Sequence, residues 1–393
     1  MADAYDVVVI GAGIVGAACA YACARRGLSV AVLDRGGLVA GTTGSGEGNL
    51  LVSDKLPGPE LDLALLSNRL WRTWADELGG RYGDIELEPK GGLIVTRSEA
   101  GLAALHRTAA EQAAAGVTTE ILDVAEIRRY EPAISRHLAG GVRYPQDMQV
   151  MPARAAAALL AAARDLGASV RLRTEVVALH RDGAGRVVGV GTPAGRVDAG
   201  HVVNAAGAWA GQVAALAGAD VPVAPRRGVI LVTEPVGLLI RHKVYSADYL
   251  DNVASDEASL QTSTVVEGTP AGTILIGAAR ELVGFDDRLN VEAVRRLAAG
   301  AVALFPALAR VRLMRVYHGF RPFSPDHLPV IGADPRAPGL VHAHGHEGAG
   351  IGLAPATGHL VAQVVAGERP DLDLGPFDPA RFAGPEVTVR AAA

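Results

Sequence analysis

The stretch VVVIGAGIVGAACAYACARRGLSVAVLD, Val7 to Asp34, decides the fold of this chain. An apolar run of strand length leads into Gly11, Gly13 and Gly16, which have the spacing G-x-G-x-x-G. A segment of helical composition follows, and a second short apolar run ends at Asp34. Two short apolar strands joined through a helix predict a βαβ unit with parallel strands.

Each position of the glycine motif has a mechanical reason. The first glycine permits a tight turn, Gly13 lets the backbone approach a pyrophosphate at the helix N-terminus, and Gly16 lets helix and strand pack closely. Asp34 is placed to accept hydrogen bonds from two ribose hydroxyls. Glycines that only serve a turn are the alternative, but strand, helix and acidic residue in register predict a dinucleotide site.

The residues after the second strand favour FAD over a nicotinamide dinucleotide. The loop DRGGLVAGTTGSGEGNLL, Asp34 to Leu51, is rich in Gly, Thr and Ser and has no helical period. Such a loop can follow an extended cofactor and donate backbone N–H groups along it. A surface loop without a ligand is the alternative that length alone leaves open.

Composition bounds the remaining possibilities. A chain of 393 residues, 49% of them hydrophobic, predicts two packed domains. The net charge of -5 and the lack of a Lys/Arg stripe argue against a nucleic-acid partner. Acidic MADAYD precedes the apolar segment Val7 to Ala24, and glycines interrupt that segment, so we expect no export signal, no integral membrane segment and a cytoplasmic location. Cys19 and Cys23, the only cysteines, are expected to be buried thiols.

The order of elements predicts an α/β fold, with a Rossmann-like dinucleotide-binding domain and an interleaved α+β substrate domain built on an antiparallel sheet. The helix PARAAAALLAAARDLG and the strands after it belong to the first domain. Strands such as GVILVTEP and GTILIGAA and the helix NVEAVRRLAAGAVALF belong to the second. We expect residues 1–84, 145–222 and 318–393 to form the first domain, and residues 85–144 and 223–317 the second.

Four motifs carry a family resemblance over nearly the whole chain: VVVIGAGIVGAACAYACARRGLSVAVLD, VVNAAGAWA, GFRPFSPDHLPVIG and GHEGAGIGLAPATG. The sequence resembles the FAD-dependent amine and amino-acid oxidoreductases, which include D-amino-acid oxidase, D-amino-acid dehydrogenase, glycine oxidase and sarcosine oxidase. In motif form it is most similar to the flavin subunits of D-hydroxyproline dehydrogenase, opine oxidase and hydrogen cyanide synthase. That similarity implies O2 or a protein electron acceptor, and a hetero-oligomeric partner subunit.

Carried over residue by residue, the resemblance implies cofactor-binding residues in all parts of the first domain. They are Gly11, Gly13, Ile14, Val15, Gly16, Asp34 and Arg35 at the ADP half; Thr42, Thr43, Ser45, Gly46, Glu47, Gly48 and Asn49 along the cofactor; Val176, Ala206 and Gly207 in the middle of the chain; Gly319 and Arg321; and Gly348, Ala349, Gly350, Ile351 and Gly352 at the flavin ring. The last set opens a helix, whose N–H groups and dipole suit the negative charge of a reduced flavin. No second intact glycine motif supports a separate NAD(P)H site.

Two departures from the family matter. Gly319 stands where monomeric sarcosine oxidases carry the cysteine that holds flavin covalently, so the resemblance implies non-covalent FAD. Gly352 stands where those oxidases use a lysine for the substrate carboxylate, and Arg321 is placed like the carboxylate-binding arginine of glycine oxidase and D-amino-acid oxidase. Its fork geometry suits a planar anion. A structural salt bridge is the alternative for Arg321.

Other polar candidates are weaker. His344, His346 and Glu347 approach the flavin loop, and the resemblance places Glu47 and Asn49 where the first loop nears the ring. Any of them could polarise substrate, tune the flavin or serve only as a hydrogen-bond partner. Tyr245 and Tyr249 could cap the substrate pocket or belong to the core. The run HAHGH lacks the carboxylate or cysteine ligands that would complete a metal site, so no metal is predicted.

These features predict an enzyme that deaminates a small amino acid oxidatively with FAD. The α-hydrogen would leave as hydride for flavin N5, and the imine would be hydrolysed to a 2-oxo acid. The alternatives are a non-catalytic FAD-containing subunit of a dehydrogenase complex, and oxidation of a 2-hydroxy acid or glycerol 3-phosphate.

Overall fold

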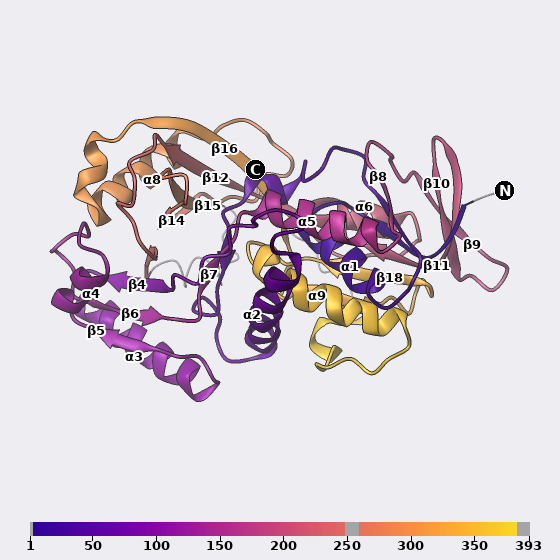
Figure 1. The fold of residues 1–393 in the computed structure, drawn as a ribbon, viewed down its shortest axis with the longest axis horizontal. Helices are drawn as coiled ribbons and strands as arrows, with labels where there is room; N and C mark the ends of the chain where they lie inside the picture. Colours follow the sequence, from indigo (N-terminus) through magenta and orange to yellow (C-terminus); the bar gives the residue numbers. More distant parts are fainter. Residues whose placement is uncertain (1–2, 248–258, 383–393) are drawn as a thin grey trace.

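Two eight-stranded sheets organise the chain in the computed structural model, which describes residues 3–247 and 259–382 (Figure 1). The first sheet lies on the right in Figure 1 and the second on the left, with helix α2 (Pro59–Leu78) between them. The chain moves from the first sheet to the second and back twice. The α/β class with a Rossmann-like domain is therefore confirmed.

The first sheet has the strand order β17-β18-β11-β1-β2-β8, and β10 and β9 extend it beside β11. Its strands are β1 (Asp3–Ile10), β2 (Val30–Leu33), β8 (Ser169–Arg171), β9 (Ala178–Arg181), β10 (Val187–Thr192), β11 (Gly195–Asn204), β17 (Val330–Ala333) and β18 (Leu340–His344). The strands from β18 to β8 run parallel to one another. Parallel strands are covered on both faces, which explains why DVVVIG and SVAVLD are continuously apolar.

Helices α1 (Ile14–Ala24), α5 (Pro152–Asp165) and α9 (Gly350–Val365) pack together beside this sheet, and α2 packs on α9. Helix α1 is apolar on all sides because neighbours surround it. Gly358 allows α9 to pack closely on α1, because a Cβ at this position would lie 2.5 Å from the backbone carbonyl carbon of Ala18. Short helix α6 (Ala210–Ala215) follows β11. Cys19 and Cys23 are buried free thiols in α1, and burial raises the pKa of Cys23 to about 12.

The second sheet has the order β16-β12-β15-β14-β13-β4-β6-β5. Its strands are β4 (Gly92–Thr96), β5 (Glu120–Leu122), β6 (Gly140–Tyr144), β12 (Ala224–Thr233), β13 (Lys243–Ser246), β14 (Gln261–Gly268), β15 (Ile274–Arg280) and β16 (Leu313–Phe323). The pairs are antiparallel except β13 with β4. Strand β16 pairs with β12 along its whole length, so residues 318–323 lie in the second sheet.

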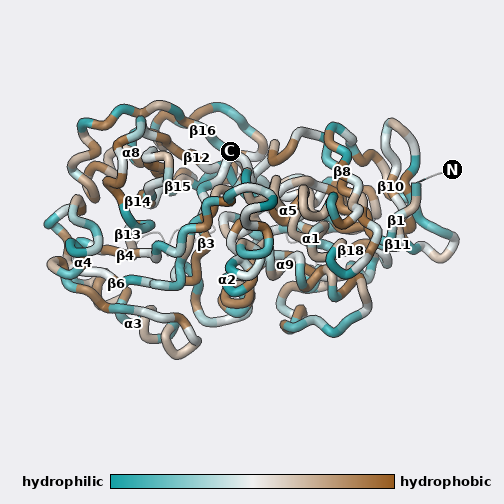
Figure 2. Tube along the Cα trace, in the orientation of Figure 1, coloured by the Kyte–Doolittle hydropathy of each residue, from teal (hydrophilic) through white to brown (hydrophobic). Residues whose placement is uncertain are grey.

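Helices cover the second sheet and give it a core of its own. Helix α8 (Val291–Leu304) buries Ala293, Leu297, Ala301 and Leu304 against β12, β14 and β15, at the spacing of one helical face. Helices α3 (Glu99–Ala114) and α4 (Val124–Tyr130) lie beside β6. Figure 2 shows hydrophilic residues frequent on the outer loops and hydrophobic stretches inside both halves. Strands β3 (Asn49–Leu50) and β7 (Met148–Gln149) form a small ladder near the junction.

Candidate active site

A cavity of about 630 Å³ is lined by segments of both sheets. Its walls come from the carboxyl ends of β1 and β2, the loop after β2, the start of α9, and strands β12, β15 and β16. In open parallel sheets ligands bind outside the carboxyl ends of the strands. The cavity therefore begins where the glycine motif lies and extends toward the second sheet.

The glycine motif has the geometry that its spacing predicts. Gly11 has a φ of 114°, and a Cβ there would lie 2.4 Å from the carbonyl oxygen of Ala205. A Cβ on Gly16 would lie 1.9 Å from the carbonyl oxygen of Gly11, so this glycine packs helix against strand and does not line the cavity. Helix α1 has no side-chain cap at Gly13. Gly13, Ile14 and Val15 line the cavity, so this N-terminus turns backbone N–H groups toward it, which suit a pyrophosphate. The N–H of Ile14 donates to Thr43 Oγ1 at 3.0 Å.

Asp34 follows β2 and lines the same end of the cavity. Its Oδ2 accepts from the N–H of Ala12 at 2.7 Å, and its Oδ1 accepts from the N–H of Gly36 at 2.7 Å. These bonds fix the carboxylate without using all of its acceptor sites. The position is that of the ribose-binding acid in the dinucleotide motif.

The loop after β2 carries the cavity wall toward the second sheet. A 3-10 turn, η1 (Thr42–Ser45), interrupts it, and Thr42 Oγ1 donates to the carbonyl oxygen of Phe320 at 2.6 Å. Gly319 is needed there, because a Cβ would lie 2.4 Å from the Cβ of Ser45. This contact joins the predicted cofactor loop to β16.

Most of the predicted cofactor residues line one continuous cavity. They are Gly11, Gly13, Ile14, Val15, Asp34, Arg35, Thr42, Thr43, Ser45, Gly46, Glu47, Asn49, Val176, Ala206, Gly207, Gly319, Arg321, Gly348, Gly350 and Ile351. The wall does not include Gly16, Gly48, Ala349 or Gly352. Gly48 instead packs on the chain, since a Cβ there would lie 1.7 Å from the carbonyl oxygen of Val150.

Tyr245 does not line the cavity, although the sequence suggested that it caps the substrate pocket. It is fully buried on β13, where its hydroxyl hydrogen-bonds Ser53 Oγ, which in turn contacts Asp147. Burial raises the pKa of Tyr245 well above its ordinary value. The other suggested cap, Tyr249, lies outside the described residues.

Several cavity residues were missed from the sequence. They include Trp209, Gln212, Gly228, Ile230 and Ala278. The guanidinium of Arg35 lies over the ring of Trp209, with Arg35 Cζ 4.6 Å from a ring centroid. Trp209 belongs to the motif VVNAAGAWA, so the sequence did contain a signal for this residue. Gly228, Ile230 and Ala278 lie on strands whose pairing only the structure reveals.

Arg321 lies at the second-sheet end of the cavity. Its Nη1 donates to the carbonyl oxygen of Ala279 at 2.7 Å, which fixes the guanidinium against β15. Gly228 leaves room for it, because a Cβ there would lie 2.1 Å from Nη1. A planar fork held this way suits a carboxylate.

Glu347 also lines the cavity, with a φ of 47°. Its Oε1 lies 2.8 Å from Arg226 Nη1 and 3.9 Å from Arg280 Nε. Burial alone would raise the pKa of this carboxyl, but His327, whose Nδ1 lies 3.6 Å from Oε2, and the nearby arginines lower it to about 2. Glu347 is therefore an anion that balances buried arginines.

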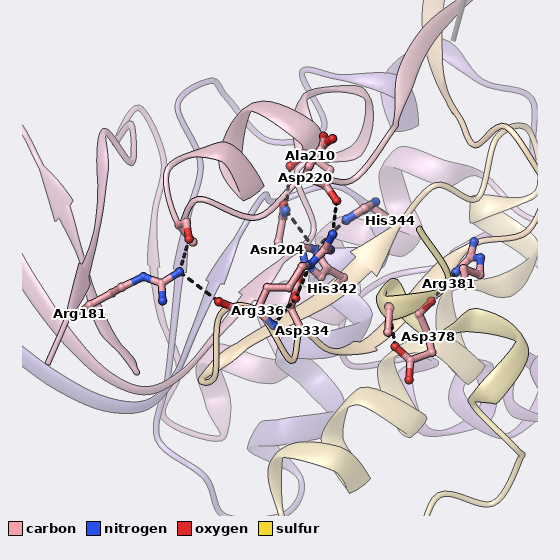
Figure 3. Close-up of polar contacts among 12 residues, drawn as sticks. Arg181, Asn204, Ala210, Asp220, Asp334, Arg336, His342, His344, Asp378 and Arg381 are labelled. Carbon is pink, nitrogen blue, oxygen red and sulfur yellow. Dashed lines mark hydrogen bonds and ion pairs between the residues drawn. The ribbon is translucent and has the colours of Figure 1, made fainter. Parts of the chain in front are cut away.

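His346 lies in the cavity wall, where Nε2 is 2.9 Å from Thr357 Oγ1. Burial lowers its pKa to about 3, so the ring is neutral at physiological pH. Figure 3 shows the neighbouring histidines: His344 Nε2 lies 2.9 Å from His342 Nδ1, and His342 Nε2 lies 3.1 Å from Asp334 Oδ2. His342 and His344 of the run HAHGH are therefore joined to each other and to Asp334. Among residues 3–247 and 259–382 no cluster of three His, Cys, Asp or Glu side chains is arranged for a metal.

Glu47 reaches from the loop after β2 toward the second sheet. It is 8% exposed, and its Oε2 accepts from Asn49 Nδ2 at 2.8 Å and lies 3.7 Å from Lys243 Nζ. Lys243 is also 3.3 Å from Glu267, so one buried cation lies between two buried carboxylates. Burial raises the pKa of Glu47, and the charge of Lys243 opposes that shift.

The cavity fits an extended dinucleotide with a reactive ring at the second-sheet end. Asp34 and the α1 N-terminus suit the adenosine diphosphate half, and the uncapped N-terminus of α9 suits a ring that gains negative charge. Helix α9 begins at Gly350, as the motif predicted. Fold and cavity together define a protein of the Rossmann-like, dinucleotide-binding class.

The chain belongs to the FAD dependent oxidoreductase family, whose pattern it matches over residues 6–364. It is 33% identical to hydrogen cyanide synthase subunit HcnC of Pseudomonas aeruginosa, over 99% of each chain. It is 32% identical to the glycine oxidase of Geobacillus kaustophilus, over 98% of this chain and 99% of the relative.

Solved structures agree with this assignment. The crystal structure of glycine oxidase from Geobacillus kaustophilus superposes with a TM-score of 0.87 at 30% identity, and covers 97% of this chain and 100% of that one. L-proline dehydrogenase from P. horikoshii gives a TM-score of 0.87 at 25% identity, over 98% and 99% of the two chains. The protein is thus an FAD-dependent oxidoreductase, as the four motifs predicted. None of the helices in the described part of the chain has the length and apolar character that a membrane crossing requires.

Proposed function

We propose that this flavoenzyme oxidises the C–N bond of a small amino acid, such as glycine, a D-amino acid, D-hydroxyproline or an N-substituted glycine. The product is an imine, which water hydrolyses to a 2-oxo acid. The observation that carries the proposal is the position of Arg321, a carboxylate-binding group in the cavity that also holds the dinucleotide motif. The similarity to glycine oxidase supports it.

Arg321 binds the substrate carboxylate and thereby orients the α-carbon. Its bond to Ala279 and the space above Gly228 hold the guanidinium in one place, so little side-chain entropy is lost on binding. Ile230, Ala278 and Ile351 make the neighbouring wall apolar, which excludes water and strengthens the ionic contact. The arginine thereby fixes the acid end of the substrate.

FAD, when bound, accepts the α-hydrogen of the substrate as a hydride. We propose that it is held non-covalently, because Gly319 has no nucleophile and both cysteines are buried in α1. Residues 1–84, 145–222 and 318–393 would bind FAD, and residues 85–144 and 223–317 would shape the substrate pocket. The start of α9 supplies N–H groups that stabilise negative charge on the ring.

The electron acceptor of the cycle is O2 or a partner protein. One relative is by name a subunit, that of hydrogen cyanide synthase, and others carry the name bifunctional protein ThiO/ThiG. These names support a partner in a larger assembly. Two cysteines in one helix provide no ligand set for an iron-sulfur cluster in this chain, so a cluster would belong to the partner.

Substitution of Arg321 tests the proposal. Arg321→Ala should keep FAD and fold but lose roughly 3 kcal/mol or more in kcat/KM, because one residue both binds and aligns the acid. Arg321→Lys should recover only part, since a point charge does not reproduce the fork. Acetate or benzoate should perturb the flavin spectrum of the wild type and not of the Ala variant. Unchanged preference for amino acids over the corresponding decarboxylated amines would show that Arg321 is structural.

A further inference from the structure

The carboxylate of Glu47 faces the cavity from the loop after β2. Its two oxygens differ in environment. Oε2 has the amide of Asn49 and the ammonium of Lys243 nearby, whereas Oε1 is buried without a hydrogen-bond partner among the described residues. A buried carboxylate oxygen without a donor is costly, so the chain keeps a site there for a donor that is not its own.

Asn49 adds a second acceptor of the same kind. It lines the cavity, its Nδ2 is bonded to Glu47, and its Oδ1 is buried with no partner in the described part of the chain. Two acceptors beside one another suit a ligand with several N–H donors, and an ammonium group carries three. A hydroxyl group has one, and a phosphate at neutral pH has few or none.

Glu47 and Arg321 both contact strand β15 beside the cavity. A Cβ on Gly277 would lie 2.2 Å from Glu47 Oε1, and the carbonyl oxygen of Ala279 accepts from Arg321 Nη1. The two side chains therefore meet the strand two residues apart. An α-amino acid carries its carboxylate and its nitrogen on one carbon, so its two charged ends suit an arginine and a carboxylate placed beside each other.

From these contacts we infer that Glu47 binds the ammonium group of the substrate while Arg321 binds its carboxylate. This inference rests on the proposed function and names the substrate class: zwitterionic α-amino acids with at least one N–H, in preference to 2-hydroxy acids and simple carboxylates. Lys243 is a positioning residue: its ammonium lies 3.7 Å from Oε2, so that Oε1 is left for the ligand. Glu267 pairs with the same lysine at 3.3 Å outside the cavity wall and has no part in binding the substrate.

Ligands that cannot be oxidised separate binding from turnover. 2-Aminoisobutyrate and pivalate have the same branched carbon next to a carboxylate and no α-hydrogen, and they differ in the amine. Each is titrated into the oxidised holoenzyme while the flavin spectrum is recorded. The wild type should bind 2-aminoisobutyrate more tightly than pivalate, and Glu47→Gln should reduce that preference by roughly 10- to 100-fold, the range of a hydrogen bond to a charged group.

Glu267→Gln is the matched control, because Glu267 is a buried glutamate that pairs with the same lysine but does not line the cavity. It should keep the preference for the amine. An equal loss in both variants would mean that Glu47 only neutralises Lys243, and this would overturn the inference. Equal weakening of both ligands by Glu47→Gln would assign Oε1 to the flavin and overturn it too.

A second variant covers a loss of fold. If Glu47→Gln does not retain FAD, Glu47→Asp keeps the charge for Lys243 but withdraws the carboxylate by one methylene, and it should lower the amine preference in the same direction. A preference equal to that of the wild type in Glu47→Asp would then contradict the inference. If pivalate perturbs the wild-type spectrum and 2-aminoisobutyrate does not bind better, only the role of Glu47 fails. If neither ligand binds, both the role of Glu47 and the proposed function fail.

Discussion

Arg226 and Glu347 form a buried ion pair, with Nη1 2.8 Å from Oε1 and neither side chain more than 9% exposed. The pair joins strand β12 of the second sheet to the segment that leads into α9. Arg226 also donates to Gln261 at 2.9 Å, so the guanidinium is held by two strands of one sheet and by one loop of the other half. The cavity wall at Glu347 is therefore part of the junction between the two halves.

Removing the charge of Glu347 should destabilise the protein. Glu347→Gln leaves the buried guanidinium of Arg226 without its carboxylate, and loss of one partner of a buried pair costs about 3 kcal/mol or more. The measurement is the free energy of unfolding in urea at pH 7. Glu292→Gln is the control, because Glu292 forms exposed pairs with Arg295 and Arg296. Equal stability of the two variants would contradict a structural role of the Arg226 pair.

The same carboxylate should make stability depend on acid pH. The pKa of Glu347 is about 2 in the folded protein against an ordinary 4.5, so its contribution is present above pH 4.5 and is lost as pH falls toward 2. Unfolding free energies measured between pH 6 and pH 3 should fall more steeply for the wild type than for Glu347→Gln. Parallel curves would mean that the carboxyl has the same pKa in both states.

Asp34 should contribute to FAD affinity through the ribose hydroxyls. Asp34→Ala removes their acceptor, and we expect the dissociation constant of FAD to weaken by roughly 1 to 3 kcal/mol. Asp6→Ala is the control, because Asp6 accepts from the N–H of Ser29 at 2.8 Å at the opposite end of the same strands. FAD titration of the apoprotein measures both. An unchanged dissociation constant of FAD in Asp34→Ala would contradict the role of Asp34 as the ribose-binding residue.

FAD should leave the protein without a covalent remnant. Gly319 offers no nucleophile, and the thiols Cys19 and Cys23 are buried in α1. Acid or heat precipitation should release all yellow colour into the supernatant. Flavin that stays with the denatured chain would contradict the prediction and point to a different attachment residue.

Gly228 should control the position of Arg321. In Gly228→Ala the new Cβ would lie 2.1 Å from Arg321 Nη1, so the guanidinium must move away from Ala279. KM for the amino acid should rise about tenfold or more, with FAD binding retained, because the carboxylate contact loses its alignment. Gly183→Ala, where no atom lies within 4 Å of the added Cβ, should leave KM unchanged. A wild-type KM in Gly228→Ala would show that Arg321 does not hold the substrate.

The sequence was sufficient for the elements whose signals are local. The glycine motif predicted β1, α1 and β2 because turn, dipole and packing act within one βαβ unit, and GHEGAGIGLAPATG predicted the start of α9 for the same reason. The sequence did not predict that Glu47, Lys243 and Glu267 lie together. These residues meet only because β13 and β14 pair in one register, and a shift by one residue would turn each side chain to the other face.

Tyr245 is a residue that the sequence suggested for the substrate pocket and that the structure places outside the cavity wall. Its neighbourhood on β13 did not reveal which face of the strand meets the cavity. The structure turns it toward Ser53, in the interior between the sheets. Composition gave no hint of this, because tyrosine serves equally well in a pocket and in a polar core contact.

The most direct test of the central claim is the anaerobic reduction of the purified yellow protein. Glycine, sarcosine, a set of D-amino acids and D-hydroxyproline are mixed with it one by one, beside glycolate, D-lactate and glycerol 3-phosphate, and the flavin absorbance is followed. Oxidation of a C–N bond predicts that at least one amino acid bleaches the flavin and yields its imine or 2-oxo acid in stoichiometric amount. Bleaching by a hydroxy acid or by glycerol 3-phosphate alone, or by none of the compounds, would contradict the claim.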